Sequence, residues 1–511
     1  MRQYRVHNQS EYFRGDENDA GFASKWGLLW KSIIRSSLGN TAYPYCLYIR
    51  SLDLRNLATL LDDRHFQNAA MESFFAGDMA KFLKAQETPV KLKTRHGKKT
   101  QKRTNVPLIL DLVGESVTNF VSQAAHRNRT TVALEDIAGD INSLALSRWT
   151  GRLSRLKSVT LYDGAVLNED VATSINNHCS SFDDLTVKGF SMRDDVDAEV
   201  ASFFSTLRSN SLQSVTVLSA QAVGPAILLA LNNHSQSLTT LKLDELKADG
   251  IKNLNLLQGC KALEVLDLQD SDGFINLEAT ENDVFLEVIA WLAGCDRLRE
   301  LAFKKLISAP AILTNVCLRN NIRLKKLELY DYSLLSSQDL HQAISLQTTL
   351  ESLILRADPE GAFGDDIDIL VSSVTQLTNL KELDIVDTSD YFSTPNIKQI
   401  ALSLRNLEKF SFSGHEVTDD LWPSLAGLHQ LRALDAQALT FFTSDGLLNY
   451  ISTLQPTNEG LLLSVPSQNG ENDLSDAEKT IIQESIWEKV GGKFEFDLYR
   501  DVDSEFGSEA D

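Results

Sequence analysis

The chain has 511 residues, 43% of them hydrophobic and 23% charged, and its 49 Lys and Arg against 70 Asp and Glu give a formal net charge of minus 21. This acidic balance argues against general affinity for nucleic acid or an anionic membrane, and no apolar run reaches the ~18 to 20 residues that span a bilayer. The five cysteines, an odd number without a C-x-x-C pair, exclude a disulfide framework and a structural zinc spacing.

The amino-terminal residues MRQYRVHNQSEYFRG contain no apolar signal-peptide core, so we expect a cytoplasmic or nuclear protein. An apolar segment, FASKWGLLWKSIIRSS, begins at Phe22 and is followed by Tyr43, Pro44 and Tyr45. We assign residues 1–45 to an amino-terminal cap or to the remnant of a larger domain.

Residues 46–155 begin with CLYIRSLDL, in which Ile49, Leu52 and Leu54 follow an L-x-x-L-x-L template that is then lost. We therefore predict divergent first repeats with an insertion at 84–106. The insertion carries KLKTRHGKKTQKR at 91–103, which has seven Lys or Arg and no acid. Such a run is either a solvated surface segment or a nuclear-import signal.

Residues 156–465 repeat the L-x-x-L-x-L template, and the eleven matches average 27.5 residues apart, since 275 residues separate the first from the last. The first apolar positions are Leu156, Phe182, Leu212, Leu238, Leu263, Leu298, Leu324, Leu350, Leu380, Leu407 and Leu431. This period is typical of leucine-rich repeats, each a short strand followed by a helical return.

The spacing within each match predicts which side chains are buried. Alternate residues of a strand point to opposite faces, so Leu241 and Leu243 are expected to point inward while Lys242 and Asp244 point outward. We therefore predict an α/β leucine-rich-repeat solenoid of the ribonuclease-inhibitor type, a horseshoe with parallel strands on its concave face and helices on its convex face. Asparagine pairs near the ends of the returns, such as Asn232 and Asn233, are predicted to close the helices in the left-handed conformation.

Four of the five cysteines share one position in the template. Cys46, Cys179, Cys260 and Cys295 each precede the first apolar residue of a match by three. Because a small hydrophobe fits the turn between helix and strand, we interpret these thiols as packing residues and not as nucleophiles or metal ligands.

Residues 466–511 are assigned to a carboxyl-terminal cap and an acidic tail. Ser475 and Glu478 form a capping-box pattern ahead of an apolar stripe, and KFEFDLYR alternates as an edge strand does. A solenoid needs such a cap to shield its last apolar face.

Two sets of motifs resemble a known family. HCSSFDDLTV, GCKALEVLDL and GCDRLRELAF are similar to the cysteine-containing leucine-rich repeats of F-box proteins, which select substrates for cullin-RING ubiquitin ligases. Leu29, Trp30, Lys31 and Ile33, followed by Tyr43, Pro44 and Tyr45, resemble the end of an F-box and its linker in filamentous-fungal members. The opening half of an F-box is missing or truncated. The resemblance implies that an adaptor-binding remnant would consist of Leu28, Leu29, Trp30, Ile33 and Ile34.

No hydrolase, zinc-protease, P-loop or dinucleotide-binding motif occurs in a suitable context, so we predict no enzyme, no metal and no cofactor. The candidate site is instead the outward side of the strands, where Tyr and Arg are frequent anchors of protein interfaces. Its predicted members are Tyr162, Lys188, Lys242, Asp244, Asp267, Gln269, Lys304, Glu328, Tyr330, Arg356 and Asp384.

These observations favour protein recognition, and the resemblance favours the substrate-recognition subunit of an SCF-type ubiquitin ligase or a derivative of one. Its partners would be a substrate protein and the cullin adaptor, with neither nucleic acid nor membrane. Two alternatives stay open, a leucine-rich-repeat scaffold without a ligase connection and, with less support, a Ran-type GTPase-activating protein.

Overall fold

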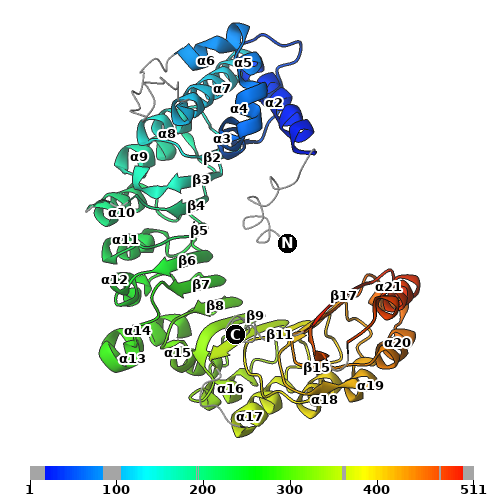
Figure 1. Cartoon of the computed structure of the whole chain (residues 1–511). Coiled ribbons are helices and arrows are strands. Elements are labelled where there is room, and N and C mark those ends of the chain that lie inside the picture. The colour runs from blue at the N-terminus through cyan, green and yellow to red at the C-terminus, as the bar shows by residue number, and fades with distance from the viewer. Residues whose placement is uncertain are drawn as a thin grey trace, which may run out of the picture. The chain divides into compact units, whose positions relative to one another are not determined.

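The structure is a computed structural model that describes residues 18–84, 105–191, 193, 195–358, 364–470 and 473–498. The basic run at 91–103 and the acidic tail from 499 onward therefore lie outside the described residues. The chain forms two compact units, Met1–Leu238 and Thr239–Asp511, called unit 1 and unit 2 below. In each unit helices line one side of parallel strands (Figure 1).

Unit 1 begins with a helical cap and continues with strand-and-helix repeats. Its strands are β1 (Ser51–Asp53), β2 (Asp136–Gly139), β3 (Ser158–Asp163), β4 (Asp184–Gly189) and β5 (Ser214–Val217). Its helices are α2 (Asn18–Ser37), α3 (Leu54–Asp62), α4 (Arg64–Ala69), α5 (Met71–Phe74), α6 (Lys81–Lys84), α7 (Val106–Asn128), α8 (Ser143–Thr150), α9 (Glu169–His178), α10 (Val196–Thr206) and α11 (Pro225–Ala230).

Unit 2 continues the repeat. Its strands are β6 (Thr240–Leu246), β7 (Val265–Asp270), β8 (Glu300–Lys304), β9 (Lys326–Ser333), β10 (Ser352–Asp358), β11 (Glu382–Ile385), β12 (Lys409–Phe412), β13 (Val417–Thr418), β14 (Ala433–Ala436), β15 (Thr440–Phe441), β16 (Leu462–Gln468) and β17 (Lys493–Leu498). Its helices are α12 (Ala248–Ile251), α13 (Leu277–Thr280), α14 (Asn282–Ala293), α15 (Ala309–Cys317), α16 (Gln338–Ile344), α17 (Gly364–Val374), α18 (Thr394–Ser403), α19 (Trp422–Leu425), α20 (Ser444–Thr453) and α21 (Asp476–Val490).

The inward leucines stack from strand to strand, which confirms the predicted fold class, an α/β leucine-rich-repeat solenoid. In unit 2, Leu241 is paired in register with Leu266, and Leu266 with Leu301, and the ladder continues through Leu327 and Leu353. All eleven predicted first positions are buried, none more than 2% exposed. One continuous apolar core per unit follows from this register, as expected when each repeat buries its face against the next.

The helical cap of unit 1 is built on close packing between α7 and α8. A Cβ atom on Gly114 of α7 would lie 2.2 Å from the Trp149 ring of α8, so only glycine leaves room for that ring. The Trp149 indole NH donates to Glu115, which also pairs with Arg152. The sequence period is lost here because long helices, and not a regular repeat, provide the apolar contacts.

The asparagine pairs do not close helices, so that prediction was wrong. None of the six asparagines of the three pairs has a positive φ, and the structure describes all of them: Asn176, Asn177, Asn232, Asn233, Asn320 and Asn321. Instead their amides satisfy backbone carbonyls of the adjacent repeat: Asn233 donates to Leu207 O at 2.8 Å and Asn321 to Ala293 O at 3.0 Å. The repeated asparagine therefore supplies hydrogen bonds that a helix-to-strand turn cannot make within itself.

The carboxyl-terminal cap has the predicted elements. Ser475 and Glu478 form the capping box at the start of α21, and the following strand β17 pairs in parallel with β16. The predicted packing role of the cysteines fits their burial, since the four phased thiols are 0% exposed. Burial raises the pKa of Cys179, Cys260 and Cys295 to about 12, which keeps these thiols protonated.

Candidate protein-binding surface on the strands

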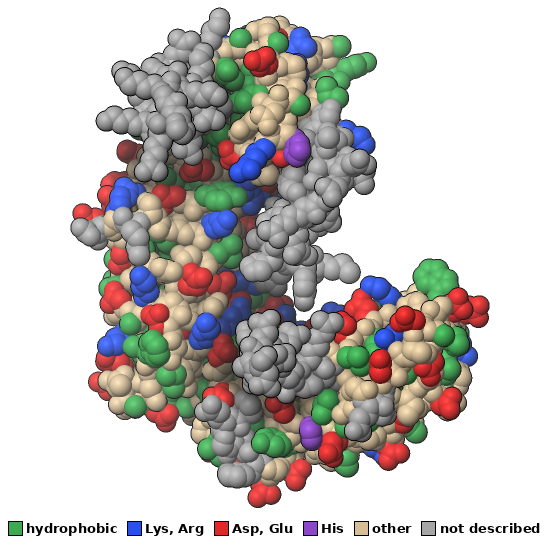
Figure 2. Space-filling model, in the orientation of Figure 1, with side chains coloured by type: hydrophobic (Ala, Val, Ile, Leu, Met, Phe, Trp, Pro, Cys, Tyr) green, Lys and Arg blue, Asp and Glu red, His purple; other side chains and the backbone are tan. Residues whose placement is uncertain are grey.

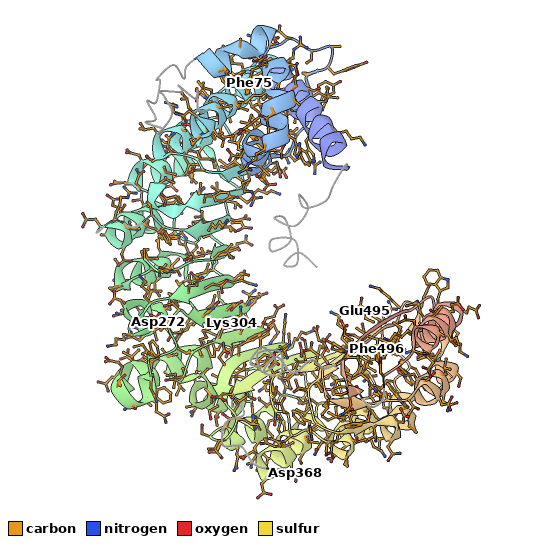
Figure 3. The ribbon with its side chains drawn as sticks, viewed as in Figure 1. Phe75, Asp272, Lys304, Asp368, Glu495 and Phe496 are labelled. Carbon is orange, nitrogen blue, oxygen red and sulfur yellow. The ribbon has the colours of Figure 1, made fainter. Side chains whose placement is uncertain are left out.

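The outward side chains of β6 to β12 form a polar surface on unit 2, called the strand face below. The register places Lys242 beside Asp267, Gln269 beside Lys304, Lys304 beside Tyr330, and Tyr330 beside Arg356. The eleven predicted residues thus separate into nine on the consecutive strands β6 to β11 of unit 2 and two on unit 1, which are Tyr162 and Lys188. Figure 3 labels Lys304 at the end of β8.

The first cluster on the strand face surrounds Lys304. Its ammonium lies 3.0 Å from the Asp267 carboxylate and 3.9 Å from that of Asp244, and 6.0 Å from the centre of the Tyr330 ring. The exposed fractions of the three charged side chains are 24% for Lys304, 11% for Asp267 and 25% for Asp244. Two carboxylates therefore share one ammonium in a partly desolvated setting.

This sharing leaves Asp244 incompletely satisfied. Its Oδ1 atom is buried and accepts no hydrogen bond. Burial, followed by the charge of Asp267, raises the pKa of Asp244 to about 6. Burial lowers the pKa of Lys304, but Asp267 and Asp244 outweigh it and raise that pKa. Lys242, whose charge also acts on Asp244, is the other cation beside this cluster, and Asp244 Oδ1 keeps the capacity to accept a hydrogen bond from a partner.

The second cluster is a two-pronged pair between Arg356 and Asp384. The Arg356 guanidinium donates to both Asp384 oxygens, at 2.5 and 2.6 Å, and to the Val386 carbonyl at 2.7 Å. Between the clusters lies the half-buried Tyr330, whose pKa is raised by burial and then by the charge of Glu328. Glu328 pairs with Lys326 at 2.5 Å. Fixed pairs of this kind hold the surface in one arrangement before any partner arrives.

Sequence reasoning did not identify the pairing or some members of this surface. Lys326 and Glu382 begin their strands on the outward side, two positions before residues that were predicted. The same L-x-x-L-x-L template that located Glu328 and Asp384 would have found them. The partners of each charge could not be found this way, because Arg356 and Asp384 are 28 residues apart and meet only through strand register.

The outward strand surface of unit 1 differs in chemistry. The Lys188 ammonium lies 4.6 Å from the centre of the Tyr162 ring, and Tyr162 is 40% exposed. The remaining outward positions are short: the register aligns Ser158 with Asp136 and Asp184, and Ser158 donates to Asp136 at 2.7 Å. Charged anchors with long side chains are therefore concentrated on unit 2.

The five residues of the predicted adaptor-binding remnant, all on α2, do not share one environment. Leu28 and Leu29 are 64% and 50% exposed, whereas Trp30 and Ile34 are 4% and 0% exposed, and Ile33 is half-buried. Trp30 and Ile34 are one helical turn apart and belong to the core of unit 1. Only Leu28 and Leu29 are well placed to contact another protein.

Among the described residues, no group of three or more His, Cys, Asp or Glu side chains could hold a metal ion. Within the same part of the chain, no helix combines the length and apolar character needed to cross a membrane. Basic and acidic side chains are intermixed on the visible surface in Figure 2.

No family model matches the chain, and no curated protein matches its sequence. Solved structures similar to it include a complex of Rad7 and Elc1 in yeast, at 12% identity and TM-score 0.38, covering 71% of this chain and 86% of that one. A TLR13–ssRNA13 complex matches at 14% identity and TM-score 0.34, and the match covers 66% of this chain and 54% of that one. A third similar structure is the leucine-rich-repeat ectodomain of the Arabidopsis thaliana receptor kinase GASSHO1/SCHENGEN3 in complex with CASPARIAN STRIP INTEGRITY FACTOR 2. It matches at 12% identity and TM-score 0.35, and the match covers 66% of this chain and 44% of that one.

Proposed function

We propose that this protein recognises another protein, and that the strand face of unit 2 is the binding surface. The observation that carries the proposal is the placement of Tyr330 between two fixed ion-pair clusters, one around Lys304 and one around Arg356. Tyr and Arg are the residues that most often supply binding energy in protein interfaces. Asp267 holds Lys304 and Asp384 holds Arg356, so these two side chains beside Tyr330 lose little conformational entropy on binding.

At a finer level, the bound protein is the substrate of an SCF-type ubiquitin ligase in the cytoplasm or nucleus. The cysteine-phased repeats and the Leu29-Trp30 segment support this level by resemblance to F-box proteins. The exposure of Leu28 and Leu29 supports it as well, because an adaptor needs apolar side chains that it can reach. A scaffold with the same strand face and no ligase connection is the competing function.

The first experiment tests the strand face with a Lys242→Ala, Tyr330→Ala double variant. These residues are chosen because replacing Lys304 or Arg356 would leave the partly buried Asp267 or Asp384 unpaired and so disturb the fold. The control variant is Lys398→Ala, Leu346→Ala, which removes one lysine and one exposed apolar side chain from the helix side. Partners retained by the wild-type chain should be lost only by the first variant. Equal retention by both variants would contradict the strand-face assignment.

The second experiment separates the ligase from the scaffold. A Leu28→Ala, Leu29→Ala variant keeps the buried Trp30 and Ile34, so it should fold as the wild type does. The wild-type chain is expected to retain purified cullin adaptor and the variant is expected to release it. If the wild-type chain does not retain the cullin adaptor, the proposed role in a ubiquitin ligase is wrong, whereas the proposal of protein recognition is unaffected.

A further inference from the structure

Loops that follow four strands of unit 2 each expose a large apolar side chain. Phe274 follows β7 and is 81% exposed, Ile307 follows β8 at 45%, Leu335 follows β9 at 45%, and Tyr391 follows β11 at 67%. We call these strand-to-helix loops the exit rim. The loops in the same position after β3, β4 and β5 of unit 1 expose no large apolar side chain among their described residues.

Backbone hydrogen bonds join the residues that follow β8, β9 and β11 to the carboxyl-terminal ends of the neighbouring strands β9 and β10, which places the exit rim along one edge of the sheet. The bonds run from Lys305 N to Tyr330 O, from Leu334 N to Asp358 O, and from Ala357 N to Asp387 O, each at 3.1 Å. A Cβ atom on Gly273 would lie 3.4 Å from Lys305 O, which places the Phe274 loop against the next one.

Charged residues adopt an uncommon backbone conformation along this edge of the sheet, in the exit rim and at neighbouring strand ends. Five residues at or shortly after the carboxyl-terminal ends of strands in unit 2 have left-handed φ values of 52 to 60°, and four of them are acids: Glu245, Lys305, Asp331, Asp387 and Glu416. Glycine would adopt this conformation with less strain. The backbone hydrogen bonds of Lys305 and Asp387 use this geometry, and it leaves acidic side chains at the surface.

The exit rim is consequently acidic as well as apolar. Asp272 is exposed, the Asp387 side chain is 80% exposed, and Asp331, near the end of β9 beside the rim, is exposed as well. Among the described residues of these loops, Lys305 is the only Lys or Arg. Exposed leucines also occur on the helix side, at Leu318 and Leu402, but the residues adjacent to them in the sequence are not acidic. A ligand for the rim must supply positive charge together with apolar contact.

We propose that the exit rim of unit 2 binds a segment of a partner protein in which Lys or Arg alternates with large apolar residues. The proposal rests on the proposed function, because it gives the chemistry of the protein partner. Phe274 and Tyr391 are four strands apart, which is about 19 Å at ~4.8 Å per strand. An extended segment rising ~3.3 Å per residue therefore needs about six residues to reach from one to the other.

The experiment uses the full chain and a library of random peptides of about 12 residues, twice the length that the rim requires. Peptides enriched on the wild-type chain are measured by fluorescence anisotropy against two rim variants. One is Asp272→Lys, Asp331→Lys. A lysine at position 331 is compatible with the left-handed conformation there, because Lys305 adopts the same conformation in the native chain. The other is Phe274→Ser, Tyr391→Ser. The matched control, Leu318→Ser, Leu402→Ser, removes two apolar side chains that are 54% and 51% exposed on the helix side.

Enriched peptides should be basic with alternating apolar residues, should bind each rim variant about tenfold more weakly, and should bind the control as they bind wild type. Peptides that are neutral or acidic, or that bind the rim variants as tightly as wild type, would overturn the proposal. No enrichment on the wild-type chain relative to the rim variants would overturn it too.

Two further comparisons in this experiment test whether something other than a partner segment binds the exit rim. A synthetic peptide of residues 91–103, basic but with Leu92 as its one large apolar residue, is the charge-only probe. If it binds as tightly as the enriched peptides, the chain itself is the occupant and the partner proposal fails. If the Lys242→Ala, Tyr330→Ala variant loses protein partners while the rim variants keep them, strand-face recognition stands and the rim proposal fails. If the rim variants lose protein partners while the Lys242→Ala, Tyr330→Ala variant keeps them, the strand face is not the binding surface and the rim proposal stands.

Discussion

Replacing Asp244 by Asn is expected to stabilise the protein above neutral pH, which is unusual for a substitution at a candidate binding surface. Burial and the charge of Asp267 raise the pKa of Asp244 to about 6, and its Oδ1 accepts no hydrogen bond. The difference from an ordinary aspartate is about two pH units, or about 3 kcal/mol at most. Because the side chain is still 25% exposed, we expect a gain in free energy of unfolding of about 1 to 2 kcal/mol.

The pH dependence distinguishes this cause from general repacking. At about pH 8, Asp244 is ionised in both the folded and the unfolded chain, and the folded state holds the charge at a cost. Between about pH 6 and pH 4 the folded state takes up a proton first, so the cost disappears and so does the advantage of asparagine. Asp267→Asn is instead expected to lower the free energy of unfolding, because Lys304 loses its partner at 3.0 Å and keeps only Asp244 at 3.9 Å.

Urea unfolding at several pH values gives the stability difference, and hydrogen exchange of peptides covering residues 239–271 locates it. Repeat proteins can unfold in parts, so the local measurement guards against a transition elsewhere in the chain. A loss of stability for Asp244→Asn at about pH 8, or a gain that is unchanged at about pH 4, would refute the electrostatic account of this cluster.

Three other predictions follow from buried groups. Thiols whose pKa burial raises to about 12, such as Cys260 and Cys295, should react with Ellman's reagent at least about 100-fold more slowly in the native chain than in urea, and comparable rates would contradict their burial. Asn458→Ala removes amide bonds to Leu428 O at 3.0 Å and Leu431 O at 2.9 Å, so urea unfolding should show a loss of about 1 to 3 kcal/mol, more than for the exposed Asn406→Ala. Trp30→Ala should cost about 3 to 5 kcal/mol, whereas Leu28→Ala should cost under about 0.5 kcal/mol, and hydrogen exchange in α7 should report the difference.

The core of the solenoid could be predicted from the sequence because one short pattern decides both strand position and side-chain direction. Leu241, Leu266 and Leu301 recur at the template spacing, and all three are buried. Burial of an apolar face against a copy of itself leaves little freedom for other arrangements. The cap of unit 1 was not predictable in this way, since Gly114 and Trp149 meet between helices with no repeat to align them.

The chemistry of the surface was only partly predictable. The pattern located Lys304, Tyr330 and Arg356 on outward strand positions, but their partners depend on register between repeats of unequal length. The sharing of one ammonium by Asp244 and Asp267 has no signal in either repeat alone. The left-handed residues in and beside the exit rim were missed because Asp331 and Asp387 stand where a sequence pattern would expect glycine or asparagine.

Site-specific photocrosslinking tests the central claim of protein recognition by the strand face most directly. A photoreactive phenylalanine analogue would replace Tyr330 on the strand face in one protein and Leu346 on the helix side in another. With a partner that the wild-type chain retains, we expect a crosslinked product from position 330 and none from position 346. Crosslinking from position 346 without any from position 330 would contradict the account.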